Sequence, residues 1–270
     1  MRYINMIAME DNFADVIGKA QRGLGLSDAA LLARAGISQK EFDALRAEIW
    51  NRAALEKMAP ALGLNASALA GLPQYRPSAP SLAGLAVFNT PYRGMRVNAF
   101  VVWDGPDAAI FDTGADAEPI LAHLRAYSLR VGGIFLTHAH GDHIACLETL
   151  QHVVKAPVWI SSREPIPDPA RGFDAGRAFE CGRLRIETRQ TWGHSRGGVT
   201  YVVHGLERPV AVVGDALFAG SMGGGMISYA DALRTNREAI FTLPPETVIC
   251  PGHGPLTTVE QERVHNPFFA

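Results

Sequence analysis

The sequence predicts an α/β protein with a small all-helical region in front of it. Apolar residues in the first quarter of the chain recur at spacings of three and four, which is typical of amphipathic helices. Later in the chain, short β-rich runs are interspersed with helical stretches, which is typical of sheets covered by helices. Between the two patterns lies PQYRPSAPS, with three prolines in nine residues. We therefore expect a helical domain at residues 1–72, a linker at 73–83 and an α/β domain at 84–270.

The helical region also carries the signals that start and stop helices. Ser27, Ser38 and Asn65 stand where helices should begin, because their short polar side chains can cap free backbone N–H groups. Gly36 and Gly63 stand where helices should end. These signals divide the region into several short helices.

Strands are expected where short runs are rich in β-branched and aromatic residues. These runs occupy residues 84–89, 97–103, 108–112, 132–137, 156–161, 184–189, 199–203, 209–214 and 247–250. Helices are expected between some of them, around 116–127, 142–153 and 229–241.

Composition excludes several classes of function. The net charge is −2 and no long run of one sign occurs, which argues against nucleic acid as a partner. No apolar stretch approaches the roughly 18 residues that a membrane span requires, so no membrane partner is expected. The N-terminus interrupts its apolar residues with Glu10, Asp11 and Asp15, so it is not a secretory signal. Three cysteines without a CxxC pair fit a reducing compartment, and we expect a cytoplasmic protein.

The stretch THAHGDH directly follows a run with the composition of a buried strand, and it holds three histidines and an aspartate. His138 and His140 are two residues apart, so in an extended segment they point the same way. Gly141 then permits a turn, after which Asp142 and His143 can face a second position. A segment of this kind can supply two ligands to each of two adjacent metal sites.

Three further stretches place a potential ligand beside a strand end among small neighbours. His194 lies in TWGHSRGG, Asp215 in VAVVGDALF and His253 in TVICPGHGP. Together with THAHGDH they give five histidines and two aspartates, which provide eight contacts if one carboxylate bridges. Zinc accepts histidine nitrogen and aspartate oxygen and leaves a position for water. We therefore expect two divalent metal ions, zinc first, with iron or manganese as alternatives.

The order of these motifs resembles that of the metallo-β-lactamase-fold hydrolases, most of all their glyoxalase II branch. The resemblance covers about residues 84–270 and implies a four-layer αββα sandwich, with the metals at one edge between the sheets. It also implies which ligands share a metal. The first metal would be held by His138, His140 and His194, and the second by Asp142, His143 and His253, with Asp215 as the bridge. Asp112, in AAIFDTG, matches a D-x-G stretch that lies beside the metals in that family.

The resemblance implies that the protein hydrolyses a small acyl substrate, a thioester above others. Two metals can lower the pKa of a shared water from about 15.7 towards 7, and the resulting hydroxide attacks the carbonyl carbon. Asp142 is placed both to ligate a metal and to orient that hydroxide. Related short proteins read G-S-x-G-R-T-D where this chain reads GSMGGGM, so Gly224 stands in place of an arginine. This departure argues against a glutathione thioester as the substrate.

An oxidative function uses the same motifs. Persulfide dioxygenases of this fold hold a single iron with the residues equivalent to His138, His194 and Asp215. A mononuclear iron site with open positions can bind oxygen. The ligand types alone do not separate this alternative from hydrolysis.

The helical region resembles the Cro/C1-type helix-turn-helix, which implies a DNA-binding regulator as the alternative of another class. Ala33, the turn at 35–37 and Ser38 as a cap carry this resemblance. Residues 1–75, however, hold eight lysines and arginines against eight acidic residues, whereas a phosphate-binding surface should be basic. The alternative interpretation is that the helical region is a module that packs on the catalytic domain, supports a homodimer or shapes the pocket entrance.

Overall fold

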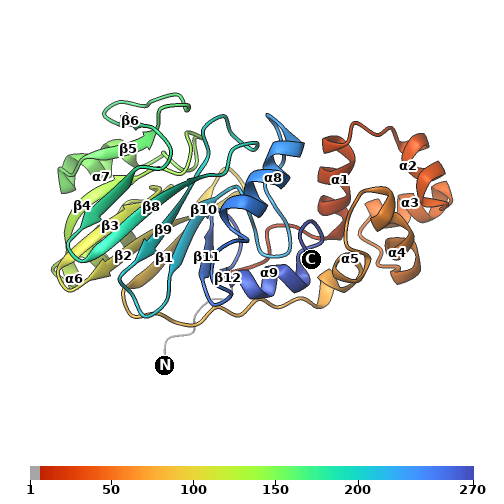
Figure 1. The fold of residues 1–270 in the computed structure, drawn as a ribbon, viewed down its shortest axis with the longest axis horizontal. Helices are drawn as coiled ribbons and strands as arrows, with labels where there is room; N and C mark the ends of the chain where they lie inside the picture. Colours follow the sequence, from red (N-terminus) through yellow and green to blue (C-terminus); the bar gives the residue numbers. More distant parts are fainter. Residues whose placement is uncertain (1–6) are drawn as a thin grey trace.

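The computed structural model describes residues 7–270 (Figure 1). The first six residues lie outside this described part. They begin the N-terminal stretch that was predicted not to be a secretory signal. The described chain starts with a helical part that comprises α1 (Phe13–Gly23), α2 (Asp28–Ala35), α3 (Gln39–Arg46), α4 (Arg52–Ala61), α5 (Ala66–Gly71) and the 3-10 helix η1 (Leu72–Gln74).

Side-chain caps fix where these short helices begin. Ser27, Ser38 and Asn65 each accept a hydrogen bond from a backbone N–H in the first turn of the following helix, as the sequence predicted. Gly36 ends α2 in the left-handed conformation, with φ of 62°. Asn12 caps α1 in the same manner and was not anticipated.

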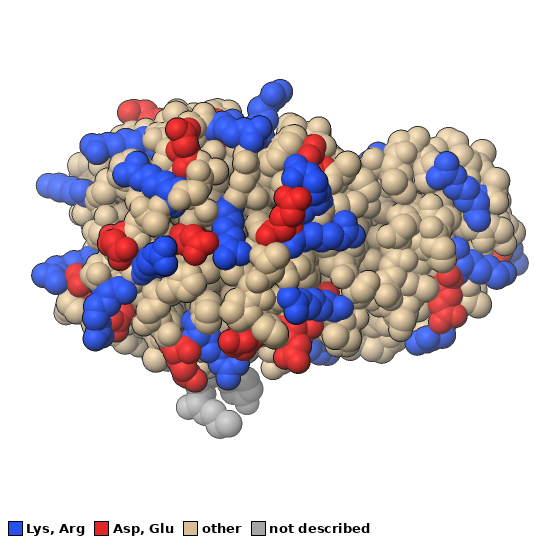
Figure 2. Space-filling model, viewed as in Figure 1, with Lys and Arg blue, Asp and Glu red and all other residues tan. Residues whose placement is uncertain are grey.

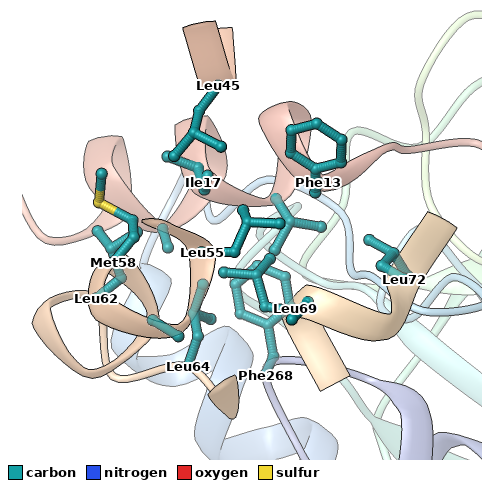
Figure 3. Packing of buried hydrophobic residues seen from close by; sticks show 14 of the residues in the cluster. Phe13, Ile17, Leu45, Leu55, Met58, Leu62, Leu64, Leu69, Leu72 and Phe268 are labelled. Atoms are coloured by element: carbon teal, nitrogen blue, oxygen red, sulfur yellow. The ribbon is translucent and has the colours of Figure 1, made fainter. Parts of the chain in front are cut away.

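The core of the helical part extends into the rest of the chain. Its buried side chains, among them Leu55, Met58 and Leu69, surround Phe268 from the C-terminal end (Figure 3). Met222, from the α/β part, belongs to the same cluster. The helical part and the α/β part therefore share one apolar interior across the linker.

Two six-stranded sheets form the second part. The first has the order β1 (Leu85–Tyr92), β2 (Met95–Asp104), β3 (Asp107–Phe111), β4 (Arg130–Phe135), β5 (Val158–Ser161) and β6 (Arg171–Phe173). The second has the order β12 (Thr257–Thr258), β11 (Val248–Pro251), β10 (Val210–Gly214), β9 (Val199–His204), β8 (Leu184–Gln190) and β7 (Ala178–Cys181). Each of the nine predicted runs forms a strand. Strands β6, β7 and β12 were not predicted: β6 and β12 have only three and two residues, and β7, with four, alternates buried and exposed residues and includes Glu180.

The sheets and helices stack in four layers. The inner faces of the two sheets enclose one apolar cluster, which includes Phe100, Phe111, Tyr201 and Val212. The outer face of the first sheet packs against α6 (Glu118–Ala126) and lies beside α7 (Leu147–Val154). The helices beside the second sheet are α8 (Tyr229–Ala239) and α9 (Val259–His265) (Figure 1). This is the αββα sandwich that the resemblance implied.

Strand direction brings the predicted ligand segments to one edge of the sandwich. Strands β10 and β11 are parallel, so Asp215 and His253 follow them at the same end. Strand β9 is antiparallel to β10, so the loop with His194 enters β9 at that end as well. The 137–143 loop joins this edge, because the Thr137 carbonyl accepts a hydrogen bond from Val199 N, 3.1 Å away.

The surface carries both signs of charge. In the view of Figure 2, lysines and arginines are interspersed with acidic residues over the sandwich, and charged groups are sparser where the helical part joins it. Among residues 7–270, no helix has the length and apolar character needed to cross a membrane.

Candidate metal centre

The structure brings all seven predicted ligands together in two groups. In the first, ligand atoms of His138, His140, His194 and Asp215 lie within 4.8 Å of one another. In the second, ligand atoms of Asp142, His143 and His253 lie within the same distance of one another. The turn at 141–143 therefore divides THAHGDH between two positions, which is the grouping expected for two metals.

The Asp215 carboxylate lies between the two groups. Its Oδ2 is 3.4 Å from His194 Nε2 and 3.9 Å from His138 Nε2, both in the first group. Its Oδ1 is 3.2 Å from His143 Nε2 and 3.5 Å from His253 Nε2, both in the second group. One oxygen faces each position, which is the geometry that a bridging carboxylate needs.

Backbone carbonyls orient two of the histidine rings. His194 Nδ1 donates to the Gly224 carbonyl oxygen at 2.9 Å, and His253 Nδ1 donates to the Arg96 carbonyl oxygen at 2.6 Å. Each bond orients its ring so that Nε2 is turned towards Asp215. Metal-binding histidines in proteins are usually held in this way, with the second ring nitrogen donating to an oxygen.

Asp112 orients two further rings, His143 directly and His138 through Thr137. Its Oδ2 accepts from His143 Nδ1 and from the Thr137 hydroxyl, each at 2.8 Å. Because the Thr137 hydroxyl donates its proton to Asp112, it accepts from His138 Nδ1, 3.0 Å away. Asp112 therefore supports His143 directly and His138 through Thr137, on the ring nitrogens that point away from the two groups. It adopts a left-handed backbone conformation, with φ of 52°.

Several buried ligand atoms of the site converge on one another. Neither His143 Nε2 nor Asp215 Oδ1 has a hydrogen-bond partner among the described residues. His140 Nδ1 lies 2.9 Å from His138 Nε2 and 3.1 Å from His194 Nε2. The hydrogen bonds that His138 and His194 make through Nδ1 leave the Nε2 atom of each neutral ring as an acceptor. Buried polar atoms seldom remain unpaired in native proteins. A divalent cation in each group would satisfy all these lone pairs, so the residues present fit two metals.

The electrostatics of the two groups differ. Burial lowers the pKa of His138 well below its usual value and also lowers that of His194, so both rings are neutral and ready to bind a cation. Burial acts in the same direction on His143, but Asp112 and Asp215 outweigh it and raise the pKa of that ring to about 10. Burial raises the pKa of Asp215, but His143 and His253 hold it well below its usual range, so the carboxylate is charged.

Glu164 joins two of the loops that carry candidate ligands, but no motif or spacing in the sequence marks it as part of the site. Glu164 is buried, and its carboxylate accepts from Ala139 N at 3.1 Å and from Gly197 N at 2.5 Å. It thereby ties the loop of His138 and His140 to the loop that follows His194. A single glutamate in a loop is ordinary in sequence, and its two partners lie 25 and 33 residues away.

Known proteins are similar in sequence to the part of the chain that carries the two ligand groups. The family model of the Metallo-beta-lactamase superfamily matches residues 92–253. The hydroxyacylglutathione hydrolase GloC of Haemophilus influenzae is 28% identical over 203 residues, which span 66% of this chain and 95% of that protein.

Solved structures agree with the sequence match. The B3 metallo-β-lactamase BLEG-1 superposes with a TM-score of 0.60 at 30% identity, over 68% of this chain and all of that one. TTHA1623, solved in a di-iron-bound form, gives a TM-score of 0.56 at 27% identity, over 67% of this chain and all of that one. In each case about a third of this chain lies outside the similarity.

Proposed function

Because the chain belongs to the metallo-β-lactamase superfamily, we propose that it is a hydrolase of a small acyl substrate, above all a thioester, that uses two divalent metal ions. The observation that carries the proposal is the Asp215 carboxylate, which turns one oxygen to each ligand group. The relatives support it in part. GloC is named for the hydrolysis of an acyl-glutathione, and TTHA1623 holds two irons. We expect zinc in this chain, with iron or manganese as alternatives.

The ligands divide between the two ions as the geometry groups them. One ion would be held by His138, His140 and His194, the other by Asp142, His143 and His253, and Asp215 would contribute to both. When bound, the ions supply Lewis acidity and make hydroxide available near neutral pH.

Asp142 is the residue we expect to act on the attacking water. Its Oδ2 lies 3.2 Å from His253 Nε2 and 3.6 Å from His143 Nε2, so the carboxylate is fixed at the second group. Burial raises its pKa, but the hydrogen bond with His253 and the nearby His143 lower it overall, which keeps the carboxylate ionised. Asp142 would orient the water and take its proton as the carbonyl is attacked. A thioester suits this site because a thiolate leaves without strong protonation.

The loop after Asp215 bears on which acyl compound is bound. Gly224, where related short proteins have arginine, offers no side chain beside His194. Met226 and Ile227, two and three residues further on, are 65% and 45% exposed. The loop therefore presents apolar side chains and no fixed cation, which supports a substrate other than the anionic glutathione thioester.

Persulfide oxidation is the second candidate, and the first ligand group favours it. His138, His194 and Asp215 alone offer two neutral imidazoles and a carboxylate, a set that suits one iron with open positions. Oxygen uptake that depends on a persulfide, together with iron in the protein, would select this function.

A substrate panel tests the hydrolase proposal. We expect metal-loaded protein to hydrolyse at least one of a series of acyl thioesters, lactones and β-lactams. Asp142→Asn should lower kcat/KM for that substrate by about 10²- to 10⁴-fold, the usual contribution of a positioned general base. Wild-type protein that is inactive on the whole panel, or an Asp142→Asn variant with full activity, would contradict the proposal.

A further inference from the structure

A largely buried lysine of the helical part contacts the segment beside the two ligand groups. Lys19, on α1, donates to the Met222 carbonyl oxygen at 2.9 Å and forms an ion pair with Asp11. Its ammonium also lies 4.9 Å from the centre of the Phe218 ring. The side chains of Lys19 and Asp11 are only 15% and 8% exposed. Ion pairs taken out of water are costly to desolvate, so this pair is by itself weak evidence for a stabilising role.

The segment that Lys19 holds is the one that positions His194. Only Gly223 separates Met222 from Gly224, whose carbonyl oxygen accepts the His194 Nδ1 proton. Gly223 is pressed against two ligands, since a Cβ atom on it would lie 1.9 Å from the Asp215 carbonyl oxygen and 2.9 Å from His194 Nδ1. A shift of the Met222 carbonyl would therefore move the oxygen that orients the His194 ring.

The same lysine also contacts the second ligand group indirectly. The Phe218 ring beneath its ammonium meets the His253 ring edge to face, with centroids 5.6 Å apart. The chain before α1 packs there too, since a Cβ atom on Gly254 would lie 3.1 Å from Glu10 N. Residues 8–19 thus border both halves of the centre.

We propose that Lys19 is a positioning residue of the metal centre, which holds Met222–Gly224 where the Gly224 carbonyl fixes the His194 ring. The proposal rests on metal binding by the ligand groups described above. It assigns a role to the helical part that the family match does not cover, because that match begins at residue 92. With Asp11 beside it, the ammonium is already neutralised, so it acts on the loop rather than on a substrate anion.

Cobalt binding by the full-length protein tests this role without any substrate. Lys19→Met keeps the apolar stem and removes the three N–H donors. We expect its affinity for Co²⁺, measured by competition with a chelator, to fall about 10-fold, the lower end of the range for residues that orient metal ligands. The visible absorption of the bound Co²⁺ should change as well, because the His194 ring tilts. Lys40→Met, at an exposed lysine of α3, is the matched control and should keep both properties.

Asp11→Asn is a second variant. It keeps Lys19 but removes the negative charge of its ion-pair partner, so the ammonium is held less firmly. Should Lys19→Met not fold, Asp11→Asn carries the same two readouts and should weaken Co²⁺ binding in the same direction. If the variant that folds binds Co²⁺ with wild-type affinity and shows an unchanged absorption spectrum, the positioning role is overturned. Wild-type protein that binds no Co²⁺ would instead contradict the proposed metal-dependent function.

Discussion

Asp112 and His143 form a buried pair in which Asp112 Oδ2 lies 2.8 Å from His143 Nδ1. Neither side chain is more than 1% exposed. The pair fixes the ring so that Nε2 faces Asp215, and the same carboxylate aligns Thr137 behind His138. A residue that binds no metal thus sets the direction of ligands in both groups.

Asp112→Asn should therefore weaken metal binding while preserving side-chain size. Loss of the negative charge removes the anchor of His143 Nδ1, and we expect zinc affinity to fall by about 10- to 100-fold, as for other residues that orient metal ligands. Chelator competition followed by metal analysis measures this change. Asp43→Asn, at an exposed aspartate of α3, is the control. Equal zinc affinity in wild-type and Asp112→Asn protein would show that the pair does not orient the ring.

Gly223 lies against two candidate metal ligands, Asp215 and His194. An alanine Cβ would lie 1.9 Å from the Asp215 carbonyl oxygen, so Gly223→Ala must displace the loop. We expect a loss of about 1–3 kcal/mol in the free energy of unfolding, as for other overpacked sites. Gly71→Ala, where no neighbour lies within 4 Å, should be neutral or stabilise the protein by about 0.4–1 kcal/mol. Denaturant unfolding of both variants checks the contrast, and equal stability would contradict it.

Phe268 ties the C-terminal end to the helical part. Its side chain is 3% exposed and sits in the cluster formed by α1, α4 and α5 (Figure 3). Phe268→Ala should lower the free energy of unfolding by about 3–5 kcal/mol. Val264→Ala, at a 60% exposed position of α9, should stay within about 0.5 kcal/mol of wild type. A Phe268→Ala variant with wild-type stability would mean that the two parts do not depend on this contact.

The helical part should not bind duplex DNA. Helices α2 and α3 follow one another across Gly36, but residues 1–75 hold as many acidic residues as lysines and arginines, whereas a phosphate-binding surface should be basic. We expect no gel shift with generic duplex DNA at low salt. A shift that weakens as salt is added would revive the regulator alternative.

Local signals explain why much of the architecture was predictable. Capping residues such as Ser27 and Ser38, and long β-rich runs, encode their elements in a few neighbouring positions. The seven candidate ligands stand beside strand ends, where parallel and antiparallel pairing brings them to one edge.

The remaining features depend on contacts between distant residues. Strand β12 is too short to have a pattern of its own and forms only against β11. Glu164 joins two loops, and Lys19 bonds to a carbonyl 203 residues away. No periodicity or spacing in the sequence predicts such pairs, because the two partners come together only in the folded chain. The same holds for the helical part, whose core is completed by Phe268.

The metal content of the purified protein tests the central claim most directly. Protein from cells grown without added zinc should be analysed for metal per chain, before and after removal by a chelator and reloading. The two ligand groups joined by Asp215 predict about two divalent ions per chain, and hydrolysis that disappears with the metals and returns with zinc. Protein that holds no metal, or about one iron per chain with persulfide-dependent oxygen uptake and no hydrolysis, would contradict the account.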